Sequence, residues 1–321
     1  MGRRIWIVLL SIALVGLTAA AVWVVPQAYD KLLGDSGTAR SARAAVEAYL
    51  TALAAGDATT ALSYSALQPQ DTRFTSDEFY SRSLAGNPIT NIVVPEEQDS
   101  GSNLISASYT LGDQAIEAHF TVQKHDRGWL LDGGFLRLSV ADLAAAGAPL
   151  TLNGVPLGEN PRLELLPGVY TLDAADPMLT VSSPNLLITY PESETTFTES
   201  LILSFDAIIA IQDAAKAHLN ACLEVQALAP PGCGFGFAGT NIGVVNPESI
   251  IWTLDKDSPD LTTLVPLLDP DSLTTASGLI SIKVNLLAYS MTQWELYEDS
   301  STISQVKADF SDPDKIKIVF H

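Results

Sequence analysis

ARSARAAVEAYLTALAAGDATTALSYS, residues 39–65, is the stretch that decides the fold of the first globular part of the chain. Apolar side chains recur in it at spacings of three and four, the pattern of a helix that buries one face. This stripe consists of Ala45, Val46, Tyr49, Leu50 and Leu53. Gly56 and Asp57 follow, and a glycine here is typical of a helix C-terminus. We expect a second, short helix over residues 59–65.

Downstream of Asn87-Pro88 the pattern changes from helical to alternating. Residues 90–98, 103–112 and 114–139 are runs of alternating polar and apolar residues separated by turn sequences, and they predict four antiparallel strands. Helices followed by an antiparallel sheet define an α+β domain, which we place at residues 39–143.

The order of these elements resembles the nuclear-transport-factor-like cone fold, in which helices pack into a curved antiparallel sheet. The resemblance covers residues 39–140 and is closest to small exported bacterial versions of the fold. The matching residues are Ala45, Tyr49, Ala52, Leu53, Gly56, Asp57, Ala61, Trp129, Leu131 and Asp132. In that superfamily the cone holds a ligand, a catalytic pair or nothing.

A pocket inside this cone is one hypothesis, and core packing of the same residues is the other. The candidates for its lining are Tyr49, Tyr80, Tyr109, His119, Trp129 and Asp132. An isomerase-like site would pair an aspartate base with a tyrosine donor, and Asp132 is the carboxylate on a late strand. His119 is the candidate for a general acid or base.

Residues 149–195 form short alternating runs separated by Asn-Gly, Pro-Gly and Ser-Pro turns, after the linker at residues 144–149. They resemble the small PEGA-like β-modules of bacterial envelope proteins. The matching residues are Leu152, Asn153, Gly154, Leu165, Pro167, Gly168, Tyr170 and Leu172. The resemblance implies a spacer, a small β-sandwich of about five strands.

Residues 200–321 repeat the order of a helix followed by β-like runs. The helix carries Ile208, Ile211, Ala215, Leu219 and Cys222 along one face. We expect a second cone-like α+β domain, with a plain α+β sandwich as the alternative.

The loop after this helix contains the glycine pattern of a dinucleotide site at Gly234, Gly236 and Gly239. Such a turn must follow a strand and open a helix, whereas this loop follows a helix. We therefore expect no cofactor here. Cys222 and Cys233 are the only two cysteines of the chain, and we predict that they form a disulfide that fastens the loop to the helix.

The first residues predict a membrane anchor. Residues 5–25 are free of charge and about long enough to cross a bilayer core of about 30 Å. Arg3 and Arg4 precede them, which places a tail of residues 1–4 in the cytoplasm. Residues 26–38 are then a linker, and the rest of the chain is extracytoplasmic. A cleavable signal peptide is the alternative, and it would export the same residues.

The net charge of −20 excludes nucleic acid as a partner, because phosphate binding needs clustered Lys and Arg. The four histidines show no zinc-ligand spacing. Asp255, Asp257 and Asp260 form a weak candidate for a Ca²⁺ site, without the spacing of an EF-hand loop.

Together, anchor, cone and β-module resemble TcaA-like cell-envelope proteins, although the cytoplasmic zinc ribbon typical of those is absent. The sequence therefore predicts a non-catalytic scaffold of the bacterial cell envelope, anchored in the membrane and bound to a protein or wall polymer. A sensor with a small molecule in the first cone is the alternative, and an isomerase- or hydrolase-like enzyme is the third hypothesis.

Overall fold

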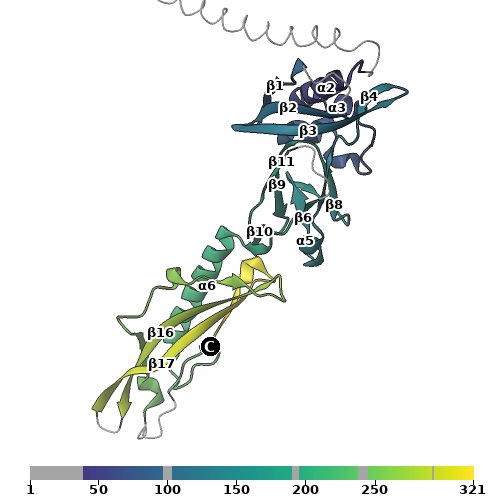
Figure 1. Ribbon diagram of the computed structural model, residues 1–321. Coiled ribbons are helices and arrows are strands. Elements are labelled where there is room, and N and C mark those ends of the chain that lie inside the picture. The colour runs from purple at the N-terminus through teal and green to yellow at the C-terminus, as the bar shows by residue number, and fades with distance from the viewer. Residues whose placement is uncertain (1–38, 97–102, 190–194, 238–244, 291–292) are drawn as a thin grey trace, which may run out of the picture. The chain divides into compact units, whose positions relative to one another are not determined.

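The computed structural model describes residues 39–96, 103–189, 195–237, 245–290 and 293–321 (Figure 1). The fold is α+β, with few helices and mostly antiparallel sheets. The chain divides into two compact units. Of the described residues, the first unit contains those within 39–141, 159–172 and 185–198, and the second contains those within 142–158, 173–184 and 199–321. The expected tail, anchor and linker, residues 1–38, lie outside the described residues.

The helices of the first unit begin where the sequence supplies a cap. Helix α2, Ala42–Ala54, starts after Ser41, whose hydroxyl accepts a hydrogen bond from the Ala44 amide. It ends before Gly56, which has a positive φ of 75°. Helix α3, Ala58–Ser63, is capped by the carboxylate of Asp57, and the 3₁₀ turn η1, Thr72–Phe74, precedes helix α4, Asp77–Ser83.

A four-stranded antiparallel sheet completes this part of the first unit. Its strands are β1, Ile89–Val93, β2, Leu104–Leu111, β3, Gln114–His125, and β4, Gly128–Leu131, in that order across the sheet. The prediction of four antiparallel strands is confirmed.

The expected extent of the last strand, to residue 139, is wrong. Strand β4 ends at Leu131, and β5, Leu136–Ser139, belongs to a separate three-stranded sheet with β8, Arg162–Leu165, and β12, Thr195–Thr196. Gly133-Gly134 separates the two strands, and a Cβ at Gly134 would lie 2.8 Å from the Cβ of Ser65. The glycine pair lets the backbone pass close to Ser65 as it leaves the first sheet.

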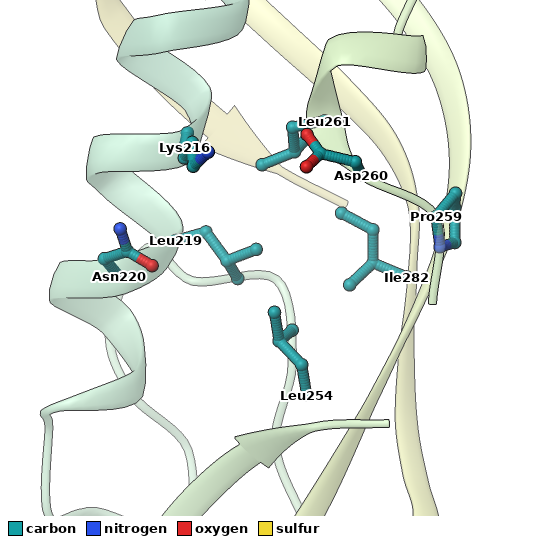
Figure 2. A pocket seen from close by; sticks show the side chains of 8 residues that line it. All are labelled: Lys216, Leu219, Asn220, Leu254, Pro259, Asp260, Leu261 and Ile282. Carbon is teal, nitrogen blue, oxygen red and sulfur yellow. The ribbon is translucent and has the colours of Figure 1, made fainter. Parts of the chain in front are cut away.

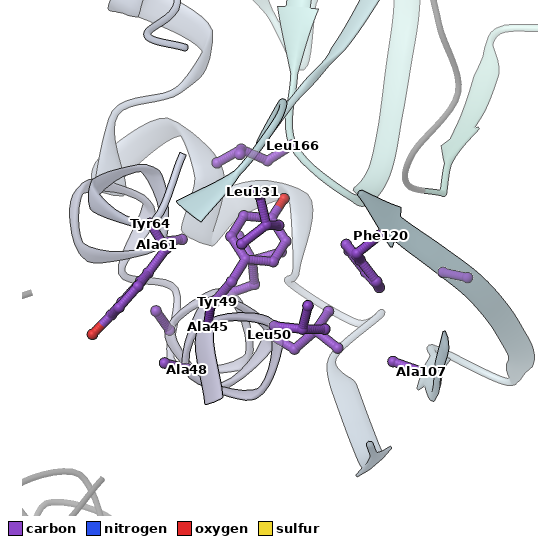
Figure 3. Close-up of a cluster of buried hydrophobic side chains, with 14 of the residues drawn as sticks. Ala45, Ala48, Tyr49, Leu50, Ala61, Tyr64, Ala107, Phe120, Leu131 and Leu166 are labelled. Carbon is purple, nitrogen blue, oxygen red and sulfur yellow. The ribbon is translucent and has the colours of Figure 1, made fainter. Parts of the chain in front are cut away.

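The core of the first unit lies between α2 and the inner face of the sheet (Figure 3). Helix α2 contributes Ala45, Tyr49 and Leu50, and the sheet contributes Ala107 and Phe120. Because side chains alternate along a strand, β2 buries every second residue and β3 does so in its central part.

The residues expected to form one β-module are divided between the two units. Strand β9, Gly168–Ala174, pairs with β11, Asn185–Ile188. Helix α5, Ala141–Ala145, is followed by the hairpin of β6, Leu150–Leu152, and β7, Val155–Pro156. Strand β10, Leu179–Val181, pairs with β13, Leu201–Leu203. The pattern predicts the strands and the Asn153-Gly154 turn, whose φ values are 47° and 76°, but not which strands pair.

The second unit packs helix α6, Phe205–Leu223, against an antiparallel sheet of five strands. The strands are β14, Ile251–Leu254, β15, Leu267–Leu268, β16, Thr275–Ser290, β17, Gln293–Asp309, and β18, Lys317–Phe320. The order is β14-β16-β17-β18, with β15 paired to β16. Strand β17 is long because β16 pairs along its whole length, from Ser290 with Gln293 to Thr275 with Asp309.

The described residues of the second unit also form three 3₁₀ turns: η3, Pro247–Ser249, η4, Leu261–Thr263, and η5, Pro313–Lys315. The predicted face of α6 is confirmed, since Ile211, Ala215, Leu219 and Cys222 are buried and Ile208 is partly buried. Among the residues that the structure describes, no helix has the length and apolarity of a membrane span.

Candidate functional sites

The interior of the first sheet and its helices is filled by side chains. Tyr49 donates a hydrogen bond to the carbonyl of Gly134 at 2.7 Å, and its ring meets that of Phe120 edge to face at 6.0 Å. Tyr80 donates to the carbonyl of Pro167 at 2.8 Å. Tyr109 is buried in the same core. The three tyrosines expected around a pocket therefore serve as core residues with buried polar ends.

The other three candidates for that pocket lie at or near the surface. His119 is exposed on β3, with its Nδ1 2.9 Å from the hydroxyl of Ser106, and Asp132 is exposed after β4. Trp129 is half-buried at the edge of the core. The structure thus brings neither His119 nor Asp132 into the interior. The alternation along β3 already predicts that His119 is exposed. Neighbouring residues of a strand point to opposite faces, so His119 points outward when Phe120 points inward.

On the outer face of this sheet, the described residues line a shallow groove of about 320 Å³. Its lining residues are Pro95, Ser106, Ala107, Ser108, Glu117, Ala118 and His119. Its polar groups are open to solvent, which suits weak surface contacts better than acid–base chemistry, for which enzymes shield the reacting groups from water.

The glycine loop of the second unit is held by a disulfide between Cys222 and Cys233. Gly234 has a φ of 68°, and a Cβ there would lie 2.5 Å from the backbone of Phe320 on β18. A Cβ at Gly236 would lie 3.1 Å from that of Ala229. Gly239 lies outside the described residues. In its described part, the loop uses glycine to pack against neighbouring residues of the chain.

Two of the three carboxylates of the Ca²⁺ candidate accept hydrogen bonds from the local backbone. Asp255 accepts a hydrogen bond from the amide of Asp257 at 2.9 Å, and Asp260 accepts one from the amide of Thr262 at 2.9 Å. These hydrogen bonds are the main reason that the pKa values of Asp255 and Asp260 lie below the usual range. No group of three His, Cys, Asp or Glu within the described ranges is placed to hold a metal ion.

A small pocket of about 90 Å³ lies between α6 and the segment from β14 to η4 (Figure 2). Leu219, Leu254, Leu261 and Ile282 form its apolar floor. Lys216 and Asn220 stand on successive turns of α6 at its rim, with Asp260 on the opposite wall. The sequence analysis missed Lys216 and Asn220. The sequence does contain a signal for them. Residues four positions apart in a helix lie on the same face, and this pair flanks the buried Leu219.

An apolar surface, which we call the outer strip, covers one end of the sheet of the second unit. It consists of Ile251, Leu287, Tyr289, Trp294 and Leu296. Ile251 and Leu296 both pair with Leu287, Trp294 pairs with Tyr289, and the two rings are 5.6 Å apart. Ile251, Trp294 and Leu296 are 44%, 54% and 56% exposed. These are adjacent residues on one sheet face, and contiguous exposed apolar surface marks interaction sites.

Comparison with known proteins finds no matching family model, no matching curated protein and no matching solved structure. The resemblances to nuclear-transport-factor-like, PEGA-like and TcaA-like proteins therefore stay predictions from sequence.

Proposed function

We propose that this chain is a membrane-anchored binding protein of the bacterial cell envelope that acts through non-covalent contacts. The observation that carries the proposal is the outer strip, because three strands present large apolar side chains to solvent on one face. Tryptophan and tyrosine are enriched where proteins meet their partners, since their rings bury much area and keep a polar tip.

Two further observations favour a scaffold over a sensor or an enzyme. The interior of the first sheet is packed with apolar side chains and tyrosines, so the space that a ligand would need is occupied. The disulfide between Cys222 and Cys233 agrees with export, since disulfides persist mainly in oxidising compartments.

The proposed layout places residues 1–4 in the cytoplasm and residues 5–25 in the membrane. The first folded part is then a nuclear-transport-factor-like cone, followed by a β-spacer. The second unit is the partner-binding part, a second helix-on-sheet domain of the cone-like kind. Its support is the packing of α6 on one face of the five-stranded sheet, which leaves the opposite face to the outer strip.

Membrane topology is tested first, in intact cells that express the full chain with cysteine probes. A membrane-impermeant maleimide should label an added cysteine at Ser102 or Asp142 and should not label one at Gly2. Labelling of Gly2 from outside, or recovery of the chain in the cytosolic fraction, would contradict the anchor.

The outer strip is tested by photo-crosslinking in the same cells. A photoreactive amino acid at Thr253, which borders the strip on β14, should capture a partner that the one at Lys307, at the far end of β17, does not. The double substitution Trp294→Ser and Leu296→Ser should remove the capture at Thr253. Equal crosslinking of the partner at Thr253 with and without the double substitution would contradict the proposal.

A further inference from the structure

The pocket between α6 and η4 has the features of a binding site for a small zwitterion. We propose that it takes the α-carboxylate, the neighbouring N–H group and the short aliphatic side chain of an amino-acid unit. The unit is either a free amino acid or the C-terminal residue of a peptide. This inference rests on the proposed function, in that it names a ligand class for the second unit.

The carboxylate would be held by α6. Lys216 and Asn220 are one turn apart at the rim, and both side chains are exposed. Within the described part of the chain, neither side chain makes a hydrogen bond or a close ion pair, and the Lys216 ammonium attracts the Asp260 carboxylate across the pocket. An ammonium and an amide N–H₂ on one helix face can donate to the two oxygens of one carboxylate.

The N–H group of the ligand would be held by Asp260 on the opposite wall. One carboxylate oxygen, Oδ1, caps η4 through the amide of Thr262, which fixes the side chain in place. The carboxylate keeps acceptor capacity beyond this bond, because an ionised carboxylate has about four lone-pair sites. Asp260 would repel a simple carboxylate but accept a hydrogen bond from an ammonium or an amide N–H, so the rim favours a ligand in which an N–H group neighbours the carboxylate.

The size of the floor limits the ligand's side chain. The pocket has about 90 Å³, well below the roughly 300–1,000 Å³ of sites that take drug-sized ligands. Leu219, Leu261 and Ile282 are buried and apolar, and Figure 2 shows them pointing toward one another. A side chain of one to three carbons fits this space, and an aromatic ring does not.

The test is ligand-observed saturation-transfer NMR on the full chain in detergent, with L-valine and L-alanyl-L-valine as probes. Both should receive saturation at the valine methyls, with dissociation constants of about 1–10 mM. Valinamide lacks the carboxylate, isovalerate lacks the ammonium, and phenylalanine has too large a side chain. Each should bind at least about threefold more weakly than valine.

The variants Lys216→Met and Asp260→Asn test the rim. Asparagine still caps a helix well, so Asp260→Asn should preserve η4. Each variant should weaken valine binding about threefold to tenfold, whereas Lys256→Met, the same charge change elsewhere on the second unit, should leave it unchanged. Circular dichroism checks that each variant is folded.

The two sources of the ligand give different results. Tighter binding of valine than of the dipeptide assigns the site to a free amino acid, and the reverse assigns it to a peptide C-terminus. The inference is overturned if neither probe is saturated, if valinamide and isovalerate match valine, or if folded Lys216→Met binds like the native chain. Failure of the amino-acid pocket would not change the crosslinking result at the outer strip. The pocket and the proposed function are therefore tested independently.

Discussion

Gly234 and Gly232 lie in the same loop, but the physical requirement for glycine differs between the two positions. Both have a positive φ, 68° and 77°. A Cβ at Gly234 would meet the backbone of Phe320 at 2.5 Å, whereas one at Gly232 would have nothing within 4 Å. Position 234 therefore excludes every side chain on grounds of space as well as conformation.

Gly232→Ala should cost about 1 kcal/mol of unfolding free energy, the cost of a left-handed alanine. Gly234→Ala should cost about 3 kcal/mol or more, because β18 must also move away from the loop. Urea denaturation of both variants measures the difference. If the two substitutions lowered the unfolding free energy equally, the backbone of Gly234 would not lie as close to Phe320 as described here.

Glu164 is a buried carboxylate of the first unit with three donors. It is 7% exposed and accepts hydrogen bonds from the amides of Gln70 and Asp71 and from the Arg137 guanidinium at 3.3 Å. The two amides lead into η1, so Glu164 fastens this segment to β8.

Glu164→Ala should lower the unfolding free energy by about 2 kcal/mol, because two amides lose a charged acceptor. Arg137→Gln should cost less than about 1 kcal/mol, since this guanidinium is 45% exposed and its ion pair is screened by solvent. Chemical denaturation of the two variants decides; a larger effect of Arg137→Gln would contradict our account of Glu164.

Among the secondary-structure elements, α6 and the loop after it form a covalently closed pair. The disulfide joins residues 11 positions apart, and both cysteines are buried beside Phe235 and Trp252, whose rings are 5.0 Å apart. On the chain-entropy account, closing a loop of this length stabilises the protein by about 2–3 kcal/mol.

The double substitution Cys222→Ala and Cys233→Ala should lower the stability of the second unit by that amount. Hydrogen exchange measured by mass spectrometry should show lost protection in α6 and the loop. A reductant should produce the same loss in the native chain and none in the double variant. Unchanged protection after complete reduction would mean that packing alone holds the loop.

Local signals in the sequence predicted the elements well, and their limits are physical. Apolar spacing and caps located α2 and α6, and alternation located β1–β4, because these patterns depend on near neighbours in the chain. Which strands pair within residues 149–195, and whether residues 293–309 form one strand, depends on the partner strand, and no local pattern specifies that partner. The pocket at Lys216 and Asp260 was missed for the same reason, since its two walls come from segments that are distant from each other along the chain.

At the scale of the whole molecule, the two units have cores of different chemistry. The first contains the buried tyrosines, among them Tyr80 and Tyr170, and the second contains the disulfide. Burial raises the pKa of both phenols above the usual value of 10.0. The native state therefore keeps these protons at a pH where the unfolded chain loses them.

The contribution of these two tyrosines to the unfolding free energy of the first unit should consequently be constant below about pH 10 and fall as the pH rises further. At pH 11 each of the two tyrosines should account for a loss of about 1.4 kcal/mol, and Tyr80→Phe should reduce the dependence on pH by one such step. Hydrogen exchange at several pH values measures this for each unit. Loss of protection in the second unit first would contradict the assignment to the tyrosines.

The long hairpin of β16 and β17 also has a consequence for the speed of folding. Its pairs run from Ser290 with Gln293 to Thr275 with Asp309, so the first contacts join residues three positions apart. Closing so short a loop costs little chain entropy, and hairpins form within about 1–10 μs. If pairing spreads from this end of the hairpin, the completed hairpin has two free edges. Strands β14 and β15 then pair with β16, and β18 pairs with β17. The largest sheet of the protein thus has a local nucleus, an exception to the slow folding that distant strand pairing usually imposes.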